Sequence, residues 1–364
     1  MRFFISPILG HMDGQGHSKY LDKALALLVA IEECGNLRSA SQSLGISYRH
    51  AWNLLSELEQ RLGGSAVEMT RGRGSELSEL GHKLVWANKQ IQARLGPLLD
   101  SMASEIDAQI QITIPEGDDG ALRLFASHGF AVEALHQRLA AQQHELEINY
   151  RGSIDAVAAL NRGMCDIAGF HVPQGALMAP ILEKYTPLFK PSFRLVCLAT
   201  RRQGMMVAKG NPMKIWDITD LKRSGIKLVN RQQNSGTRML LELLLAEHHV
   251  NKQAVAGFES VEYTHAAVAA YVASHKADVG IGVETAARQF GLDFVPLLTE
   301  RYFLVFDQKL LRDSRLSDVL DTMASNEFKA AISELPGYDP SLVVDILSLS
   351  EAFPAFELFQ ESTV

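Results

Sequence analysis

The segment NSGTR at residues 234–238 places amide, hydroxyl and guanidinium groups directly before the apolar stretch MLLELLLA. Three kinds of chemistry suit it: nucleophilic attack by a serine, binding of an anion by backbone N–H groups, or capping of a helix. A serine nucleophile needs a base and an orienting acid, and hydrolases commonly present it in a Gly-x-Ser-x-Gly turn. The segment lacks that turn and no second motif completes a triad. We therefore expect no catalytic residue and no enzyme, which leaves the anion site and the cap.

Other polar groups stand where predicted strands end or predicted helices begin. In α/β proteins such ends converge, and a helix N-terminus carries about half a positive charge that suits an anion. Arg231 or Arg238 would add a full charge. Taken singly, each group also fits a helix cap or a structural histidine. The prediction of an anion site therefore depends on several such groups coming together in one fold. The expected ligand-binding residues are Gly152, Ser153, His171, Asn234, Ser235, Gly236, Thr237, Arg238, Thr264 and His265.

The overall composition is that of a globular protein of two or three domains, with 364 residues, 47% of them hydrophobic and 21% charged. Cys34, Cys165 and Cys197 are widely separated, which predicts neither a disulfide framework nor a metal site and suits a reducing cytoplasm. No segment has the length of a secretion signal's apolar region or of a membrane span. We expect a cytoplasmic protein with no metal, no cofactor and no membrane contact.

The charge is unevenly distributed along the chain. Residues 1–95 carry 11 Lys and Arg against 9 Asp and Glu, whereas the whole chain has a net charge of −7. A modestly basic head on an acidic body suggests a polyanion-binding module joined to something else.

The head has the order of a winged helix-turn-helix over residues 1–75. Apolar residues at helical spacing predict a helix over DKALALLVAIEEC, a short helix over LRSASQS and a third over YRHAWNLLSELEQRL, with a tight turn at 44–46 between the last two. Arg71 and Arg73 stand beside glycines in a predicted two-stranded wing. The alternative is a structural three-helix bundle with a charged face.

Hydrogen-bonding side chains at the start of the third helix suit the floor of the major groove, and wing arginines suit phosphates or the minor groove. The expected DNA-binding residues are Ser47, Tyr48, Arg49, His50, Asn53, Arg71 and Arg73. The frame at 40–81, with LLSELEQRLG and TRGRGSELSELG, resembles LysR-type regulators. GISYRHAW at 45–52 is similar to the DNA-binding domain of the molybdate-dependent bacterial repressor (ModE-like). These resemblances imply double-stranded operator DNA as a partner.

A connecting helix is predicted over residues 76–105, with apolar positions spaced by three and four along one narrow seam. A second copy of the chain is the simplest partner for that seam, so we expect a homodimer, or a tetramer built from it. The alternative is packing against the chain's own body. Pro97 should kink the helix or end it near Leu95.

The body, residues 108–364, alternates predicted strands with helices, which favours parallel sheets of βαβ units. Strands are expected over 110–114, 146–150, 166–170, 193–199 and 226–230. The body is longer than a single α/β sheet usually requires, so its length predicts two lobes.

Three stretches of the body resemble the periplasmic-binding-protein-like domain of some bacterial regulators and molybdenum-cofactor-associated proteins. They lie at 150–173, at 201–212 followed by 228–245, and at 263–287. The resemblance implies a two-lobed type II fold, with lobe I near 108–195 and 300–364 and lobe II near 196–299. It places the crossings between lobes near 195–203 and 292–302. The family carries Ser-His-Asp after its first strand, where we expect Gly117-Asp118-Asp119 in this chain.

Together these features predict a DNA-binding transcriptional regulator controlled by a small anion held between the lobes. Formate or an oxyanion such as molybdate or tungstate is expected from the two resemblances, and an operon of a molybdenum enzyme such as formate dehydrogenase as the target. The alternative is a molybdenum-cofactor-related binding protein or enzyme with an accessory DNA-binding head.

Overall fold

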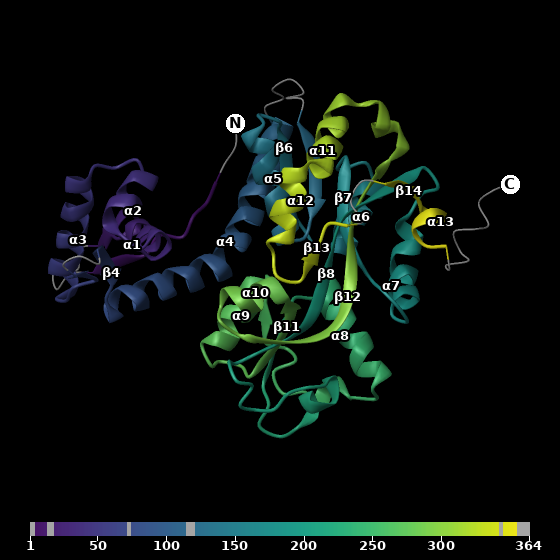
Figure 1. Ribbon diagram of the computed structural model, residues 1–364. Coiled ribbons are helices and arrows are strands. Elements are labelled where there is room, and N and C mark those ends of the chain that lie inside the picture. The colour runs from purple at the N-terminus through teal and green to yellow at the C-terminus, as the bar shows by residue number, and fades with distance from the viewer. Residues whose placement is uncertain (1–3, 13–17, 71–73, 114–120, 342–344, 355–364) are drawn as a thin grey trace. The chain divides into compact units, whose positions relative to one another are not determined.

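The computed structural model describes residues 4–12, 18–70, 74–113, 121–341 and 345–354 (Figure 1). The chain divides into two compact units, one of residues 5–99 and one made mainly of residues 100–364. Each unit is described by itself.

The N-terminal unit contains three helices, two small hairpins and the beginning of a long helix. Its elements are β1 Gly10–Met12, β2 Ser18–Tyr20, α1 Asp22–Cys34, α2 Leu37–Ser43, α3 Tyr48–Leu62, β3 Val67–Thr70, β4 Gly74–Leu77 and the first part of α4 Glu79–Thr113. The three predicted helices are confirmed.

Local capping explains where these helices begin and end. Gly35, after α1, has a φ of +72°, a left-handed conformation that glycine adopts without strain. Asn36 accepts a hydrogen bond from the backbone N–H of Ser39, and Ser47 accepts one from that of His50. Apolar faces of the three helices meet in a single core that includes Leu28, Leu37 and Leu55.

The hairpin β3–β4, the predicted wing, packs closely on the start of α4. The backbone N–H of Ser78 donates to the carbonyl oxygen of Ala66 (3.0 Å), and that of Gly81 donates to the Ser78 hydroxyl (3.1 Å). A Cβ placed on Gly81 would lie 2.1 Å from the Ala66 carbonyl oxygen. Only glycine therefore allows the hairpin to approach the helix this closely.

The long helix α4 runs without a break from Glu79 to Thr113, and two sequence predictions about it are wrong. It does not end near Leu95, one of the two effects expected of Pro97, because α4 continues through this proline to Thr113. Pro97 itself removes one backbone donor from the helix. Residues 110–113 belong to this helix and not to a strand. The β-branched residues of IQITI favour a strand locally, but the helix that began about 30 residues earlier continues through Thr113.

The main unit is built around one mixed sheet. Its strands are β5 Leu122–Ala126, β6 Leu146–Tyr150, β7 Ile167–Pro173, β8 Phe193–Val207, β9 Leu228–Arg231, β10 Val261–Glu262, β11 Val279–Val283, β12 Asp293–Asp307, β13 Tyr338–Asp339 and β14 Ile346–Ser348.

Helices cover the sheet of the main unit. They are α5 Phe130–Ala141, α6 Ser153–Asn161, α7 Met178–Tyr185, α8 Gly236–Glu247, α9 His265–Ala273, α10 Glu284–Gln289, α11 Ser314–Ala324, α12 Asn326–Ser333 and α13 Leu349–Ala352. Short 3₁₀ helices join them: η1 Thr186–Leu188, η2 Ile218–Lys222, η3 Lys252–Ala254 and η4 Gln308–Arg312.

The strand order β10-β9-β11-β8-β12-β7-β5-β6 explains the two lobes. Strands β5, β6 and β7 form one half and β9, β10 and β11 the other, each with parallel pairs. The long strands β8 and β12 pair antiparallel with each other and run through both halves. The sheet is therefore mixed, and the expectation of purely parallel pairing is corrected. Its register shifts between Pro296 and Leu298, beside Gly204, so the two crossing strands bend there.

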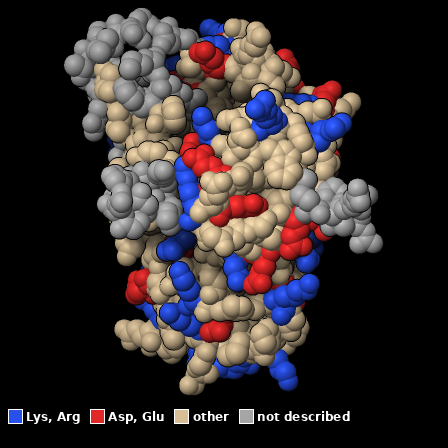
Figure 2. Space-filling view, turned by 90° about the vertical axis from the view of Figure 1, so that its left-hand side faces the viewer, with Lys and Arg blue, Asp and Glu red and all other residues tan. Residues whose placement is uncertain are grey.

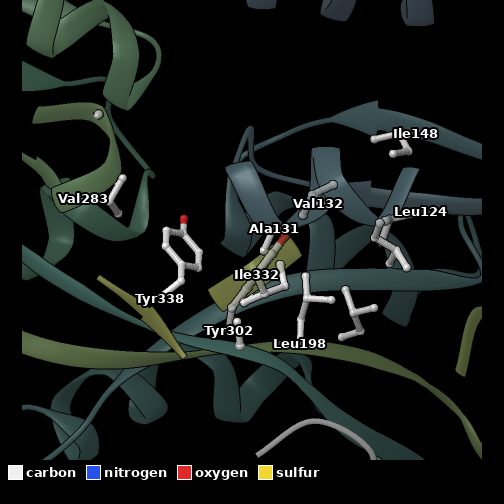
Figure 3. Packing of buried hydrophobic residues seen from close by; sticks show 14 of the residues in the cluster. Leu124, Ala131, Val132, Ile148, Leu198, Val283, Tyr302, Ile332 and Tyr338 are labelled. Carbon is white, nitrogen blue, oxygen red and sulfur yellow. The ribbon is translucent and has the colours of Figure 1, made fainter. Parts of the chain in front are cut away.

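Buried apolar residues cover both faces of the half of the sheet formed by β5, β6 and β7, which is the upper half in Figure 1. Figure 3 shows part of the cluster on one face, where Leu124, Val132 and Leu198 lie near the ring of Tyr302. A Cβ on Gly169, in the neighbouring strand β7, would lie 2.2 Å from the Tyr302 hydroxyl oxygen. This glycine of the DIAGF motif leaves room for the tyrosine. Among the described residues, no helix is long and apolar enough to cross a membrane.

Candidate functional site

The first candidate surface is the exposed face of α3. Ser47, Tyr48, Arg49, His50 and Asn53 are all exposed, as a surface that reads DNA requires. At 100° per residue, Arg49 and Asn53 lie on the side of α3 opposite the buried residues Ala51, Leu55 and Leu58. Arg71 and Arg73 lie outside the described residues.

The structure changes the expected surface of α3 in two respects. His50 lies toward the flank of the helix, where it lines a groove of about 270 Å³ with Tyr20, Glu57 and Arg61. Trp52, which the sequence reasoning did not include, is 40% exposed beside Tyr48, with ring centroids 6.5 Å apart. The signal was available in the sequence, since position 52 lies on the flank of the helix opposite to His50 and outside the apolar face. Lys and Arg side chains are interspersed with Asp and Glu on the face shown in Figure 2.

The second candidate site is in the main unit, where the starts of α6 and α8 meet the end of β7. The Ser153 hydroxyl lies 3.2 Å from Nδ1 of His171, and both residues are buried. A Cβ on Gly236 would lie 3.8 Å from the same Nδ1 and 4.0 Å from the Ser153 hydroxyl oxygen. A Cβ on Gly152 would lie 3.0 Å from the carbonyl oxygen of Asn234. Segments about 80 residues apart in the chain are thus in contact.

The helix starts around this point differ in their caps. Ser235 accepts a bond from the backbone N–H of Arg238, and Thr264 accepts one from that of Ala267, so α8 and α9 have side-chain caps. The cap positions of α5 and α6 are Gly129 and Gly152, which have no side chain to accept such a bond. Their first-turn N–H groups are the ones that a ligand could use without displacing a cap.

Arg238 does not supply the charge that the sequence suggested. Its guanidinium bonds to Glu259 (3.1 Å) and Glu242 (3.3 Å) and stacks on the ring of Phe258 at 4.6 Å. The carboxylates balance its charge because α8 turns this side chain toward them. The prediction that Arg238 binds a ligand through its side chain is therefore corrected.

Two other arginines bring positive charge to the site. Arg201 on β8 and Arg231 on β9 are both 3% exposed. Nε of Arg201 lies 2.6 Å from Oε1 of Glu300 on β12, and the same oxygen accepts from Gln203 (2.9 Å). Gln203 also donates to the Thr237 hydroxyl (3.3 Å). A Cβ on Gly129 would lie 3.6 Å from Nη1 of Arg201, which places this charge beside the start of α5.

We call this group the polar cluster and define it by eight buried residues. They are Ser153, His171, Arg201, Gln203, Arg231, Thr237, His265 and Glu300. Arg201, Gln203 and Glu300 were absent from the expected site, whereas Arg231 was expected as one of two possible sources of positive charge. The signal for the three absent residues was the runs RRQ and TERY, charged and polar residues in the middle of long apolar strands.

Arg231 carries the charge that is least well balanced. Its guanidinium donates to neutral oxygens, the Tyr263 carbonyl (2.9 Å) and Oε1 of Gln232 (3.2 Å). Burial, followed by the positive charge of Arg201, lowers the pKa of Arg231 to about 9, against the opposing effect of Glu300. Arg231 remains charged at neutral pH. Burial likewise disfavours the charge of Arg201, but Glu300 and Tyr338 together outweigh burial and raise the pKa of Arg201.

The two histidines of the cluster are neutral at pH 7. Burial, and then the charges of Arg201 and Arg231, lower the pKa of His171 well below 6.5. Burial, Arg231, Arg201 and His171 do the same for the pKa of His265. Nε2 of His171, Nδ1 of His265 and Oε1 of Gln203 are buried without a hydrogen-bond partner among the described residues. Each such atom costs about 1–3 kcal/mol, which a bound ligand would recover.

The expectation about the first strand of the body is wrong. The first strand is β5, and it follows residues 117–119, which lie outside the described residues. The residues directly after β5 are Ser127-His128-Gly129, so this chain keeps the serine and histidine of the family's Ser-His-Asp and replaces the third residue with glycine. The ring of His128 stacks on Tyr150 at 3.5 Å, next to the start of α6. The expected position depended on a predicted first strand at 110–114, but residues 110–113 belong to α4.

In the part of the chain that the structure describes, Cys34 is exposed and Cys165 and Cys197 are buried. No group of three His, Cys, Asp or Glu residues there could hold a metal ion. Burial raises the pKa of both Cys165 and Cys197 to about 12, so these thiols stay protonated and unreactive.

Family models match both parts of the chain. Residues 134–324, more than half of the chain, match the PBP superfamily domain, and residues 23–82 match the bacterial regulatory helix-turn-helix proteins of the lysR family. The chain belongs to the PBP superfamily and is a LysR-type transcriptional regulator with a ligand-binding PBP-like domain, not an enzyme. The expected fold, a helix-turn-helix followed by a two-lobed α/β domain, is confirmed.

Individual proteins similar to this chain were also found. An uncharacterized protein of Bacillus subtilis, YvgK, is 32% identical over 248 residues, which cover 67% of this chain and 79% of that protein. A hydrogen-peroxide-bound mutant of OxyR from Corynebacterium glutamicum is 15% identical, covers 86% of this chain and 93% of its own, and has a TM-score of 0.43. An ABC-type phosphate transport receptor from Vibrio cholerae is 16% identical, covers 60% and 99%, and has a TM-score of 0.45.

Proposed function

We propose that this regulator is controlled by a small anion bound at the polar cluster between its two lobes. The observation that carries the proposal is the buried charge of Arg231, whose guanidinium donates to neutral oxygens and whose charge acts on His171 and His265. Nε2 of His171, Nδ1 of His265 and Oε1 of Gln203 lack hydrogen-bond partners among the described residues. A buried cation without a matching anion is costly, and an anion bound there removes that cost.

The hydrogen-bonding groups of the cluster suit an anionic ligand. When the Ser153 hydroxyl donates to Nδ1 of His171, the neutral ring carries its proton on Nε2 and can donate it to the ligand. The free N–H groups at the starts of α5 and α6 add further donors. Glycine at 236 allows a ligand to come near the backbone.

A small ligand fits better than a large one. Gly152 and Asn234 are in close approach, and Gln203 already contacts Thr237, so a bulky occupant would have to force the lobes apart. Formate is one candidate, and molybdate or tungstate is the other. We propose that the regulated genes include those of a molybdenum enzyme such as formate dehydrogenase. The support for this target is the similarity of residues 45–52 to the molybdate-dependent repressor.

The signal would reach DNA as a shift between conformations. An anion that bridges the lobes favours the closed arrangement, and only a difference in affinity between the open and closed states can move that equilibrium. We propose that the protein acts as a dimer, or a dimer of dimers, joined through α4. Closure then changes the spacing of two α3 helices on operator DNA in the cytoplasm.

A binding experiment tests the anion site directly. The purified protein is titrated with formate, molybdate, tungstate, sulfate and small carboxylates while its thermal unfolding is followed. A ligand at 100 times its dissociation constant should add about 2.7 kcal/mol of stability. Arg231→Gln should lose the response, whereas Arg238→Gln, the matched control, should keep it. Equal responses of the two variants, or no response of the wild-type protein to any anion, would refute the site.

A further inference from the structure

We infer that the polar cluster discriminates anions by charge: it takes a monovalent anion directly and takes a divalent one only together with a proton. This inference deepens the proposed function and depends on it. The first step is the number of charges in the cluster. Arg201 and Glu300 form a buried ion pair, with Nε and Oε1 2.6 Å apart, and cancel each other. Arg231 remains, so the cluster carries one net positive charge.

The burial of these groups makes the charge count decisive. Arg201 and Arg231 are 3% exposed and Glu300 is 2% exposed, so water screens their charges poorly. A monovalent anion beside Arg231 leaves the cluster neutral. A divalent anion leaves one negative charge buried, which is unfavourable unless another group becomes positive.

The histidines are the groups able to make that change. His171 lies on β7, stacked on Tyr302 of β12 at 4.1 Å and bonded to Ser153 of α6. The charges that act on it come from Arg201 of β8 and Arg231 of β9. His265 begins α9 and is affected by the same two arginines and by His171.

These surroundings keep both rings neutral while the cluster is empty, since burial and two cations oppose a further positive charge. A divalent anion reverses the sign of the local field and favours protonation of one ring. Its binding should therefore consume about one proton, and a monovalent anion should consume none. For one coupled proton, the affinity for the divalent anion falls about tenfold for each unit of pH increase.

The test is calorimetric titration of the full chain with formate and nitrate as monovalent probes and sulfate and molybdate as divalent probes. Titrations at pH 6.5, 7.5 and 8.5, in buffers of different ionisation enthalpy, give the affinity and the number of protons taken up. We expect formate or nitrate to bind with pH-independent affinity. We expect any divalent anion to bind about tenfold more weakly at each higher pH, with uptake of about one proton.

Two variants examine the charge count itself. Glu300→Gln keeps an oxygen that accepts from Arg201 and Gln203 but raises the net charge to two, so a divalent anion should bind without proton uptake. Replacing both histidines, as His171→Gln with His265→Gln, should abolish the proton uptake that accompanies divalent anions. The wild-type proton count does not depend on either variant folding.

The outcomes separate this inference from the proposed function. If the wild-type protein binds a divalent anion at least as tightly as the monovalent probes and takes up no proton, the charge inference is wrong while the anion site stands. If binding of the monovalent probes requires proton uptake, the inference is also wrong. If none of the anions binds, the proposed function itself fails.

Discussion

The hydroxyl oxygen of Ser153 lies 3.2 Å from Nδ1 of His171, and this contact joins the first turn of α6 to the end of β7 inside the protein. It holds a neutral imidazole with its second nitrogen unpartnered among the described residues. Arg231, whose charge acts on this ring, has the unbalanced positive charge of the cluster. A hydrogen-bond donor and a cation are thus set close to each other before any ligand arrives.

The first prediction concerns the reading of DNA bases by α3. Arg49→Ala should weaken binding to a specific site by about 1–3 kcal/mol, because the arginine would lose a bidentate contact to a base. Binding to a scrambled duplex should hardly change. Fluorescence anisotropy measures both affinities on a duplex that the wild-type protein selects from a random pool.

Arg61→Ala is the matched control for Arg49→Ala, since Arg61 pairs with Glu57 on the flank of the same helix. It should leave the ratio of specific to non-specific affinity unchanged. An equal loss on both duplexes for Arg49→Ala would show that Arg49 contacts phosphates rather than bases.

The second prediction concerns the space at Gly236. A Cβ added there meets nothing closer than 3.8 Å, so packing within the protein itself does not require glycine at this position. Gly236→Ala should keep or slightly raise the free energy of unfolding, by up to about 1 kcal/mol, because alanine favours the helix. It should weaken anion binding about tenfold or more by occupying space beside His171.

Denaturant titration and calorimetry measure these two effects of Gly236→Ala. Gly96→Ala in α4, where the nearest atom to an added Cβ is 3.8 Å away, controls for the general effect of alanine in a helix. If Gly236→Ala binds anions as tightly as Gly96→Ala, the ligand does not approach this backbone.

The third prediction is a pH dependence of stability caused by His171 and His265. In the unfolded chain each binds a proton below its ordinary pKa of about 6.5, but in the folded protein neither does until pH falls to its lowered pKa. The unfolded state therefore binds more protons in this window, and stability rises with pH there. The contribution of the two histidines to the free energy of unfolding should be fully present above about pH 6.5. Below that pH, the free energy of unfolding should fall by up to about 1.4 kcal/mol per pH unit for each histidine.

Urea unfolding at pH 5.0 to 8.0 measures this slope for the wild-type protein and for His171→Gln. The variant should lose about half of the slope below pH 6.5. His248→Gln provides the comparison, because His248 is an exposed histidine of the same unit. Identical slopes for the wild-type protein and His171→Gln would mean that His171 titrates normally in the folded state.

The fourth prediction concerns the seam of α4. Leu95, Leu98 and Met102 are 44%, 38% and 46% exposed along one stretch of helix at spacings of three and four. If a second copy covers them, Leu98→Glu should weaken self-association at least tenfold by burying a charge in the interface. Sedimentation velocity over a range of concentrations measures it.

Met164→Glu replaces a methionine that is 46% exposed outside α4 and serves as the control for Leu98→Glu. It should leave the oligomeric state as it is in the wild-type protein. A wild-type chain that sediments as a monomer at all concentrations would exclude the dimer through α4.

Local patterns predicted the helices of the N-terminal unit and four strands of the main unit, β6, β7, β8 and β9. Ala51, Leu55 and Leu58 have helical spacing, and the Ser47 side chain caps the backbone N–H of His50 three residues later, so these signals lie within a few helix turns. Residues 110–113 were mistaken for a strand because local β propensity favours it, while continuity with about 30 preceding helical residues decides otherwise. That single error also misplaced the Ser-His motif, which follows β5 at Ser127 and His128.

The order of residues along the chain determines three features. They are the helix-turn-helix order, the alternation of strands and helices, and the placing of polar groups at the ends of these elements. Each depends on residues only a few positions apart. Which charges meet follows instead from the packing of distant strands. Arg201 and Glu300 are 99 residues apart and become partners because β8 and β12 pair antiparallel. Tertiary packing also pairs Arg238 with Glu259 and leaves the positive charge of Arg231 unbalanced. The energetic effect of a buried charge depends on its neighbours in space, which local sequence does not define.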